Sequence, residues 1–149
     1  MNKRILVVCA GGGHLREAVK SIRGVVDKFH LATFKTSAPD GIEGLESLTY
    51  IIDPHLSKFK YFINLIQSLF LLIKVRPNIV ITTGAGIAIP SCLIAKKLGA
   101  KLIMIDTVAA TNDLSKTGRF LYKYCDLFIV QWEEHCSKYP KAIYGGTIL

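Results

Sequence analysis

The stretch ILVVCAGGGHLREA, from Ile5 to Ala18, decides the fold. An apolar run typical of a buried strand leads into three glycines and a histidine, and a helical pattern follows. The turn consists of Gly11, Gly12, Gly13 and His14. Glycine lets backbone N–H groups face outward at a helix N-terminus, where they bind anions. We therefore predict a phosphate site at this turn, with His14 at its opening as a hydrogen-bond donor, a base or both.

Two familiar nucleotide motifs do not fit this turn. The dinucleotide fingerprint requires a glycine at the position of Arg16, and Lys35 stands near the place of its acidic residue. No Gly-Lys-Ser/Thr follows, so the P-loop pattern also fails. A nicotinamide cofactor is thus not expected, and a nucleotide-binding oxidoreductase is a disfavoured alternative. The other alternative is a plain tight turn in which His14 caps the helix.

Apolar runs alternate with helical patterns along the chain. The predicted strands are Arg4–Ala10, Phe29–Phe34, Leu48–Ile52, Asn78–Thr82, Lys101–Ile105 and Asp126–Gln131, with a last short strand and tail in Ala142–Leu149. The predicted helices are His14–Val26, Lys58–Val75, Pro90–Leu98 and Lys116–Tyr124, and Lys35–Ser47 is a polar loop. This pattern predicts one α/β domain over residues 1–149, a Rossmann-like doubly wound parallel sheet. Ligands of such sheets bind at the carboxyl ends of the strands.

A second glycine turn repeats the design of the first. In ITTGAGIAIP, the residues Thr83, Gly84 and Gly86 lie between a strand and a helix. Two such turns at the carboxyl ends of strands converge on one crevice, so both are candidates for phosphate binding. Asp106 ends the strand KLIMID and reaches the same edge, as a candidate base or as a cap of a loop or helix.

The long helix Lys58–Val75 is more apolar than a helix that covers a sheet requires. Lys60, Asn64, Gln67, Ser68 and Lys74 form a narrow polar face. One interpretation is a deeply buried core helix. The other is an interfacial helix that dips Phe62 and Leu69 into a membrane, with Lys58 and Lys74 on the headgroups.

Composition limits the remaining classes of function. The formal charge of +8 favours an anionic partner, but the six tyrosines and one tryptophan form no stacking stripe, so nucleic acid is not expected. The four cysteines show no metal-ligand spacing and indicate reduced thiols. Met1-Asn2-Lys3-Arg4 leads directly into a strand, which indicates no signal peptide. We expect a cytoplasmic protein, peripheral on the inner face of the cell membrane, with no cofactor and no metal.

Several segments together resemble a known family. VVCAGGGHLREA, ITTGAGIAIPSCLIAKKLGAKLIMID, SKTGRFLYKYCDLFIVQW and the terminal YGG are similar to the PssD/CpsF-type glycosyltransferase subunits of bacterial capsule and exopolysaccharide synthesis. These proteins are related to the membrane-recruiting subunit of the eukaryotic two-part N-acetylglucosaminyltransferase of N-glycan precursor synthesis. The likeness spans nearly the whole chain.

The resemblance implies the N-terminal half of a GT-B glycosyltransferase that is split over two chains. This half would face a polyprenyl-diphosphate-linked sugar acceptor, and a separate subunit would bind the nucleotide-sugar. The family motif assigns the acceptor-side loops to the two glycine turns. Many relatives continue the IMID strand with Glu-Ser and an arginine, whereas Asp106 is followed here by Thr107 and Val108. The shorter carboxylate and the missing arginine argue against a contact between this loop and the acceptor phosphate.

These observations lead to a set of expected roles. An inverting transfer needs a base near the acceptor hydroxyl, and His14 is the first candidate and Asp106 the second. Trp132, Ile148 and Leu149 are expected to dock the donor-binding subunit. The alternative to a catalytic subunit is a scaffold that only recruits the catalytic half to the membrane.

Overall fold

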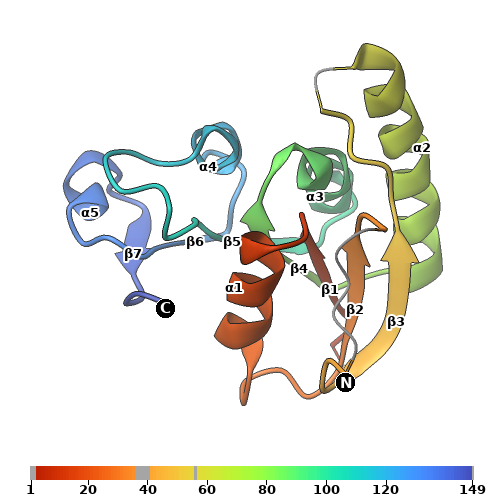
Figure 1. Cartoon of the computed structure of the whole chain (residues 1–149), viewed down its shortest axis with the longest axis horizontal. Helices are drawn as coiled ribbons and strands as arrows, with labels where there is room; N and C mark the ends of the chain where they lie inside the picture. Colours follow the sequence, from red (N-terminus) through yellow and green to blue (C-terminus); the bar gives the residue numbers. More distant parts are fainter. Residues whose placement is uncertain (1–2, 36–40, 56, 149) are drawn as a thin grey trace.

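The computed structural model describes residues 3–35, 41–55 and 57–148. Seven parallel strands form one sheet in the order β3-β2-β1-β4-β5-β6-β7 (Figure 1). The strands are β1 (Ile5–Cys9), β2 (Phe29–Thr33), β3 (Leu45–Tyr50), β4 (Ile79–Gly84), β5 (Lys101–Ile105), β6 (Leu127–Val130) and β7 (Ala142–Tyr144). The helices are α1 (Gly13–Ile22), α2 (Lys58–Val75), the 3-10 turn η1 (Gly86–Ala88), α3 (Ile89–Lys97), α4 (Lys116–Leu121) and α5 (His135–Lys138).

Two apolar clusters hold the layers together. The larger one lies on the face that α2 and α3 cover, and it includes Leu72 and Cys92. The smaller one lies under α1 on the opposite face, where Leu15 and Ala18 pack on Val7 and Leu31. Strands buried on both faces explain the continuous apolar runs of the sequence, and the predicted Rossmann-like parallel sheet is confirmed.

The order in which the strands are added to the sheet reverses between β1 and β4. Starting from the centre of the sheet, β1, β2 and β3 follow one another toward one edge, and β4 to β7 follow one another toward the other edge. The carboxyl ends of β1 and β4 are therefore neighbours, and Cys9 pairs with Gly84 in the register. This topological switch point is where a doubly wound sheet binds its ligand.

Several element boundaries differ from the prediction, most clearly those of the first helix and the third strand. The first helix ends at Ile22 instead of Val26, since Arg23 is extended and Gly24 takes a φ of 74°. The third strand begins at Leu45, inside the predicted loop, and ends at Tyr50. It is an edge strand that is half-exposed along its length, so its apolar residues do not form a continuous run.

Asp126 gives the fold a measurable dependence on acid. The hydrogen bond from Lys96 Nζ (2.6 Å) and that from the Leu102 N–H (2.8 Å) lower the pKa of Asp126 from 3.8 to about 2. A carboxylate with a lowered pKa stabilises the fold fully above its unfolded pKa, and the stabilisation is lost as pH falls toward the folded pKa. The free energy of unfolding of the wild type should therefore fall between about pH 4 and about pH 2.

Asp126→Asn should lower the free energy of unfolding at neutral pH, and the difference from the wild type should shrink toward pH 2. Urea titrations over this pH range measure both effects. Asp27→Asn, which changes an exposed carboxylate, is the matched control. A difference between Asp126→Asn and the wild type that stays constant with pH would contradict the assignment.

Candidate functional site

The two glycine turns lie side by side at the switch point. The first turn follows β1 and opens α1, and the second follows β4 and opens η1 and α3. The structure thus brings together His14 and the Thr83-Gly84 pair, which are 69 residues apart in the sequence.

His14 and Thr83 are joined by two reciprocal hydrogen bonds. The Nδ1 of His14 lies 2.9 Å from the carbonyl oxygen of Thr83, and the hydroxyl of Thr83 donates to the carbonyl of His14 at 2.7 Å. A carbonyl only accepts, so Nδ1 carries the proton and the neutral ring keeps its acceptor lone pair on Nε2. A half-buried imidazole held in this tautomer can take a proton from a substrate hydroxyl.

Gly84 is required by the close approach of the two turns. Its φ is 104°, and a Cβ at this position would lie 3.2 Å from Cε of Met104 and 3.8 Å from Cε1 of His14. The next residue, Ala85, has a φ of 70° and a ψ of 154°, a region that is occupied almost only by glycine. Its methyl group packs against the larger core cluster, which helps to hold this strained conformation.

The N-terminus of α1 has the features of an anion site. Gly12 caps the helix with a φ of 68° and without a side-chain hydrogen bond, and the first turn carries no acidic residue. Gly12 and Gly13 are exposed, and a Cβ at either would meet no atom within 4 Å among the described residues. The glycines therefore leave open space in front of N–H groups that point outward, as phosphate binding requires.

Asp106 is held in a structural arrangement. Its side chain is only 1% exposed, and its carboxylate accepts hydrogen bonds from the Ser115 hydroxyl (2.5 Å) and the Ser115 N–H (2.9 Å). Ser115 in turn caps α4 by accepting from the Gly118 N–H at 2.9 Å. Of the two roles that the sequence left open for Asp106, the contacts favour that of fixing a loop and a helix start.

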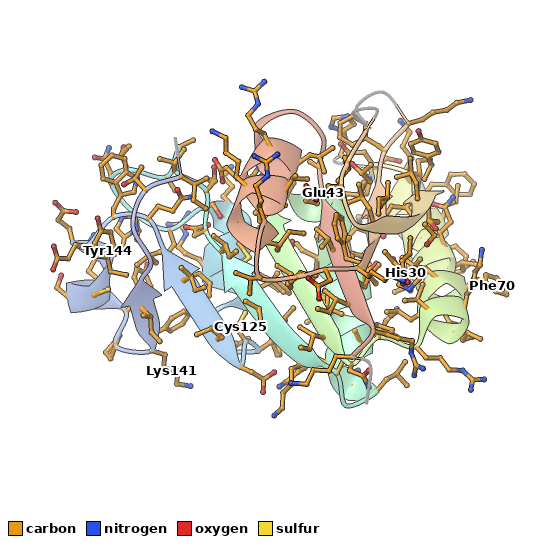
Figure 2. The ribbon with its side chains drawn as sticks, turned by 90° about the horizontal axis from the view of Figure 1, so that it is seen from below. His30, Glu43, Phe70, Cys125, Lys141 and Tyr144 are labelled. Carbon is orange, nitrogen blue, oxygen red and sulfur yellow. The ribbon has the colours of Figure 1, made fainter. Side chains whose placement is uncertain are left out.

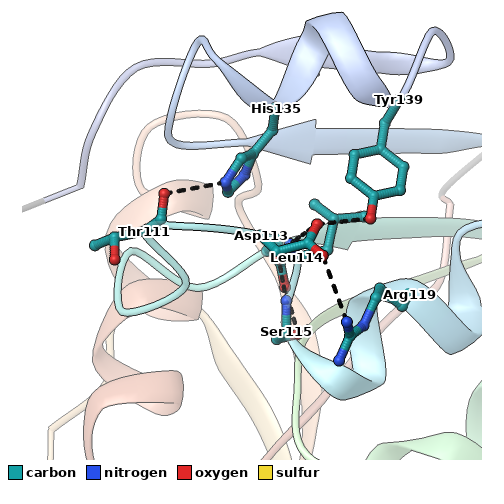
Figure 3. A network of polar contacts seen from close by, with 8 residues as sticks. Thr111, Asp113, Leu114, Ser115, Arg119, His135 and Tyr139 are labelled. Carbon is teal, nitrogen blue, oxygen red and sulfur yellow. Dashed lines mark hydrogen bonds and ion pairs between the residues drawn. The ribbon is translucent and has the colours of Figure 1, made fainter.

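The loop between β5 and α4 is anchored from several sides (Figure 3). Asp113 accepts from the hydroxyl of Tyr139 at 2.6 Å and lies 3.4 Å from the guanidinium of Arg119. The hydrogen bond from Tyr139 is the main reason why the pKa of Asp113 is lowered. The ring of His135 lies 3.3 Å from the carbonyl oxygen of Thr111. These contacts hold the loop at the carboxyl edge of the sheet.

The outward face of α2 is apolar. Its exposed large side chains are Phe59, Tyr61, Phe62, Leu65, Ile66, Leu69, Phe70 and Ile73. Phe62 and Leu69 are 58% and 44% exposed, and Figure 2 shows Phe70 pointing away from the sheet. Lys58 and Lys74 are exposed at the two ends of the helix. The interpretation of α2 as a deeply buried core helix is therefore wrong.

Much of the polar face of α2 is turned toward the protein instead of toward the surroundings. Asn64 and Ser68 are fully buried, and Asn64 Nδ2 donates to the carbonyls of Ile52 (2.7 Å) and Ile87 (3.2 Å). Gln67 accepts from the Ile52 N–H at 2.8 Å. The helix thus turns much of its polar stripe toward the protein and its apolar side toward the surroundings, the reverse of a helix on a water-exposed surface.

The expected docking residues are partly engaged with the chain itself. The indole N–H of Trp132 donates to the carbonyl of Val108 at 2.8 Å, and Ile148 packs against the smaller core cluster. Leu149 lies outside the described residues. The sequence analysis missed Glu17 and Gln131, two buried polar residues near this edge of the sheet.

Cysteine chemistry is not supported at this site. Burial raises the pKa of Cys9, at the end of β1, to about 12. Burial also raises the pKa of Cys125 to about 12 and raises the pKa of Cys92. These thiols stay protonated at neutral pH and are poor nucleophiles.

The matched family is described as "Alg14: Oligosaccharide biosynthesis protein Alg14 like", and its profile covers residues 53–148, more than half of the chain. The chain belongs to this Alg14-like family. The human UDP-N-acetylglucosamine transferase subunit ALG14 is 25% identical over 178 residues, which cover 97% of this chain and 82% of the human protein. The Candida albicans subunit of the same name is 34% identical over 84 residues, or 52% of this chain and 38% of that protein.

Solved structures show the same fold at low sequence identity. MurG of Acinetobacter baumannii superposes with a TM-score of 0.68 and 13% identity, over 89% of this chain and 43% of MurG. The UDP-GlcNAc 2-epimerase of Methanocaldococcus jannaschii gives a TM-score of 0.69 and 13% identity, over 97% of this chain and 45% of the epimerase. The Alg14-like chain therefore spans less than half the length of these structures.

Gly84→Ala should disturb the site and the fold together. A positive φ costs an alanine roughly 1–3 kcal/mol, and the new methyl group would lie 3.2 Å from Cε of Met104 and in contact with the ring of His14. We expect a lower midpoint of thermal unfolding and a shifted imidazole signal of His14 in NMR spectra. Gly86→Ala is the matched control, because a Cβ there meets no described atom within 4 Å. Equal unfolding midpoints for the two variants would contradict this account.

Proposed function

We propose that this Alg14-like chain is the acceptor- and membrane-facing subunit of a two-chain glycosyltransferase. The enzyme transfers a sugar from a nucleotide-sugar to a polyprenyl-diphosphate-linked acceptor, in capsule or exopolysaccharide synthesis of the PssD/CpsF type. The family match and the relatives named as UDP-N-acetylglucosamine transferase subunits support a sugar transfer shared with a second subunit. The observation that carries the proposal is the pair of glycine turns around His14 at the switch point.

The two turns suit the diphosphate of the acceptor. Exposed backbone at Gly12 and Gly13 offers N–H groups at the positive end of α1. The second turn, through Gly84 and Gly86, lies against the first and would bind the same group or the adjoining sugar.

His14 would be the base of an inverting transfer. Its Nε2 takes the proton of the attacking acceptor hydroxyl as the oxygen bonds to the anomeric carbon of the donor, and the nucleoside diphosphate leaves with the electrons of the broken bond. The Thr83 carbonyl on Nδ1 stabilises the imidazolium that forms. Asp106 then contributes by fixing the neighbouring loop.

The membrane would lie along α2. Its outward face offers a row of apolar side chains, and cationic residues flank the row at both ends, an arrangement that fits insertion between anionic headgroups. Among the described helices, none is long and apolar enough to cross a bilayer. Because α2 follows β3 of the parallel sheet, its amino end lies at the carboxyl edge, the same edge as the glycine turns.

The donor-binding subunit would cover the carboxyl edge. GT-B transfer takes place between two Rossmann-like domains, and this chain supplies one such sheet. Trp132, Ile148 and Leu149 remain the proposed docking residues. The alternative, a scaffold that recruits the catalytic subunit, is favoured by the apolar face of α2 but gives no role to the orientation of His14.

His14→Ala tests catalysis directly. We expect a loss of about 10²–10⁴ in kcat, the usual effect of removing a general base, with the fold and the affinity for the donor subunit intact. The assay is sugar transfer to a polyprenyl-diphosphate-linked acceptor with the donor-binding subunit present. His30→Ala, which changes a half-buried histidine on β2, is the control. Turnover of His14→Ala near that of the wild type would support the scaffold instead.

The double variant Phe62→Glu/Leu69→Glu tests the membrane contact. Two carboxylates on the outward face of α2 should release the protein from vesicles that contain anionic lipid, as sedimentation measures. Val25→Glu/Ile143→Glu is the matched control, since both side chains are exposed apolar residues away from α2. Circular dichroism checks that both variants fold. A wild type that does not sediment with the vesicles would refute the membrane contact.

A further inference from the structure

Gln131 lies at the centre of a buried hydrogen-bond network that joins distant parts of the chain. It directly follows β6, belongs to the FIVQW segment and is 2% exposed. Its Nε2 donates to the carbonyl of Asp106 at 3.0 Å and to Oε2 of Glu17 at 3.3 Å. Its Oε1 accepts from the N–H of Ile148 at 2.7 Å, and its own carbonyl accepts from the hydroxyl of Thr147 at 3.1 Å. One amide thus contacts α1, the end of β5 and the segment after β7.

Glu17 is the partner of this amide on α1. It lies on α1, three residues after His14, and is 7% exposed. Its Oε1 accepts from the Thr107 hydroxyl at 3.0 Å and its Oε2 accepts from Gln131. The Asp106 carbonyl only accepts and the Ile148 N–H only donates, so the NH₂ group of Gln131 must point toward Asp106 and Glu17 and its oxygen toward Ile148. A reversed amide would place its oxygen against two acceptors and its NH₂ group against an N–H.

We propose that Gln131 is a positioning residue that couples the segment Gly145–Ile148 to the glycine turn at the start of α1. This inference rests on the proposed function in one respect, namely that the donor-binding subunit docks near Ile148. The network ties this segment through Gln131 and Glu17 to the first turns of the helix that carries His14, so a subunit docked near Ile148 would contact one end of it.

The same network explains why a buried carboxylate is tolerated on α1. A charged group without partners in the protein interior is costly, whereas here both oxygens of Glu17 have donors. These donors come from the loop after β5 and from the end of β6. The position of α1 therefore depends on segments that follow β5 and β6, which a helix packed only through Leu15 and Ala18 would not require.

Hydrogen exchange of the full chain, without a partner, tests the coupling. Glu17→Gln should raise the exchange rate of the Ile148 amide about tenfold or more, because a single acceptor oxygen then has to serve Gln131 as well as Thr107 and the Val108 N–H. Amides of the central strand β4 should change only as much as global stability changes. Glu133→Gln, which removes an exposed charge near the same edge, should leave Ile148 unchanged.

A rate for Ile148 in Glu17→Gln within twofold of the wild type would overturn the coupling, as would faster exchange of all amides to the same degree.

The coupling can also be tested from the other end if Glu17→Gln does not fold. Removing residues 146–149 should raise the exchange rate of the Arg16 amide, which donates to Gly12 at 3.1 Å in the first turn of α1. An unchanged Arg16 amide in the folded truncation would overturn the proposal. These measurements need no second subunit, so they are separate from the test of the two-chain function. In that test, failure of the wild type to bind a donor-binding subunit would refute the proposed function alone.

Discussion

The reciprocal pair of hydrogen bonds between His14 and Thr83 is the constraint on which the site depends. It joins the loop after β1 to the end of β4, so neither turn can move without the other. Next to this pair, Gly84 has a φ of 104° and Ala85 is held in a strained conformation with a φ of 70°. Because a carbonyl faces Nδ1, the imidazole presents Nε2 as an acceptor before any substrate arrives. Such preorganisation is what a general base requires.

The orientation of α2 follows from the backbone that it covers. After β3 ends, Ile52 has an N–H and a carbonyl that need partners, and Gln67 and Asn64 supply them from the helix. Asn64 also holds the carbonyl of Ile87 next to the second glycine turn. With its polar side chains turned inward for these bonds, the helix has apolar residues left for its outer face. One helix therefore supports the site and presents an apolar surface to the surroundings.

Local patterns were enough to predict the parallel sheet and the meeting of the two glycine turns. Continuous apolar runs in short segments indicate the strands of a parallel sheet. The alternation of strands and helices indicates the topology, from which the switch-point rule locates the site. The direction of the polar stripe on α2 was not predictable, because periodicity gives the angle between the faces and not which one meets the protein. Asp106, Glu17 and Gln131 have partners 9 to 114 residues away, and only the packed structure brings them together.

A single Rossmann-like sheet with this site is chemically incomplete for sugar transfer. In the proposed two-chain enzyme, the turns and His14 would hold the acceptor and take its proton, but they lie at an open edge, where water competes with the acceptor hydroxyl for the donor sugar. Closing that edge with a second subunit would exclude water. The buried link from Ile148 through Gln131 and Glu17 to α1 joins the proposed docking segment to the helix that carries His14.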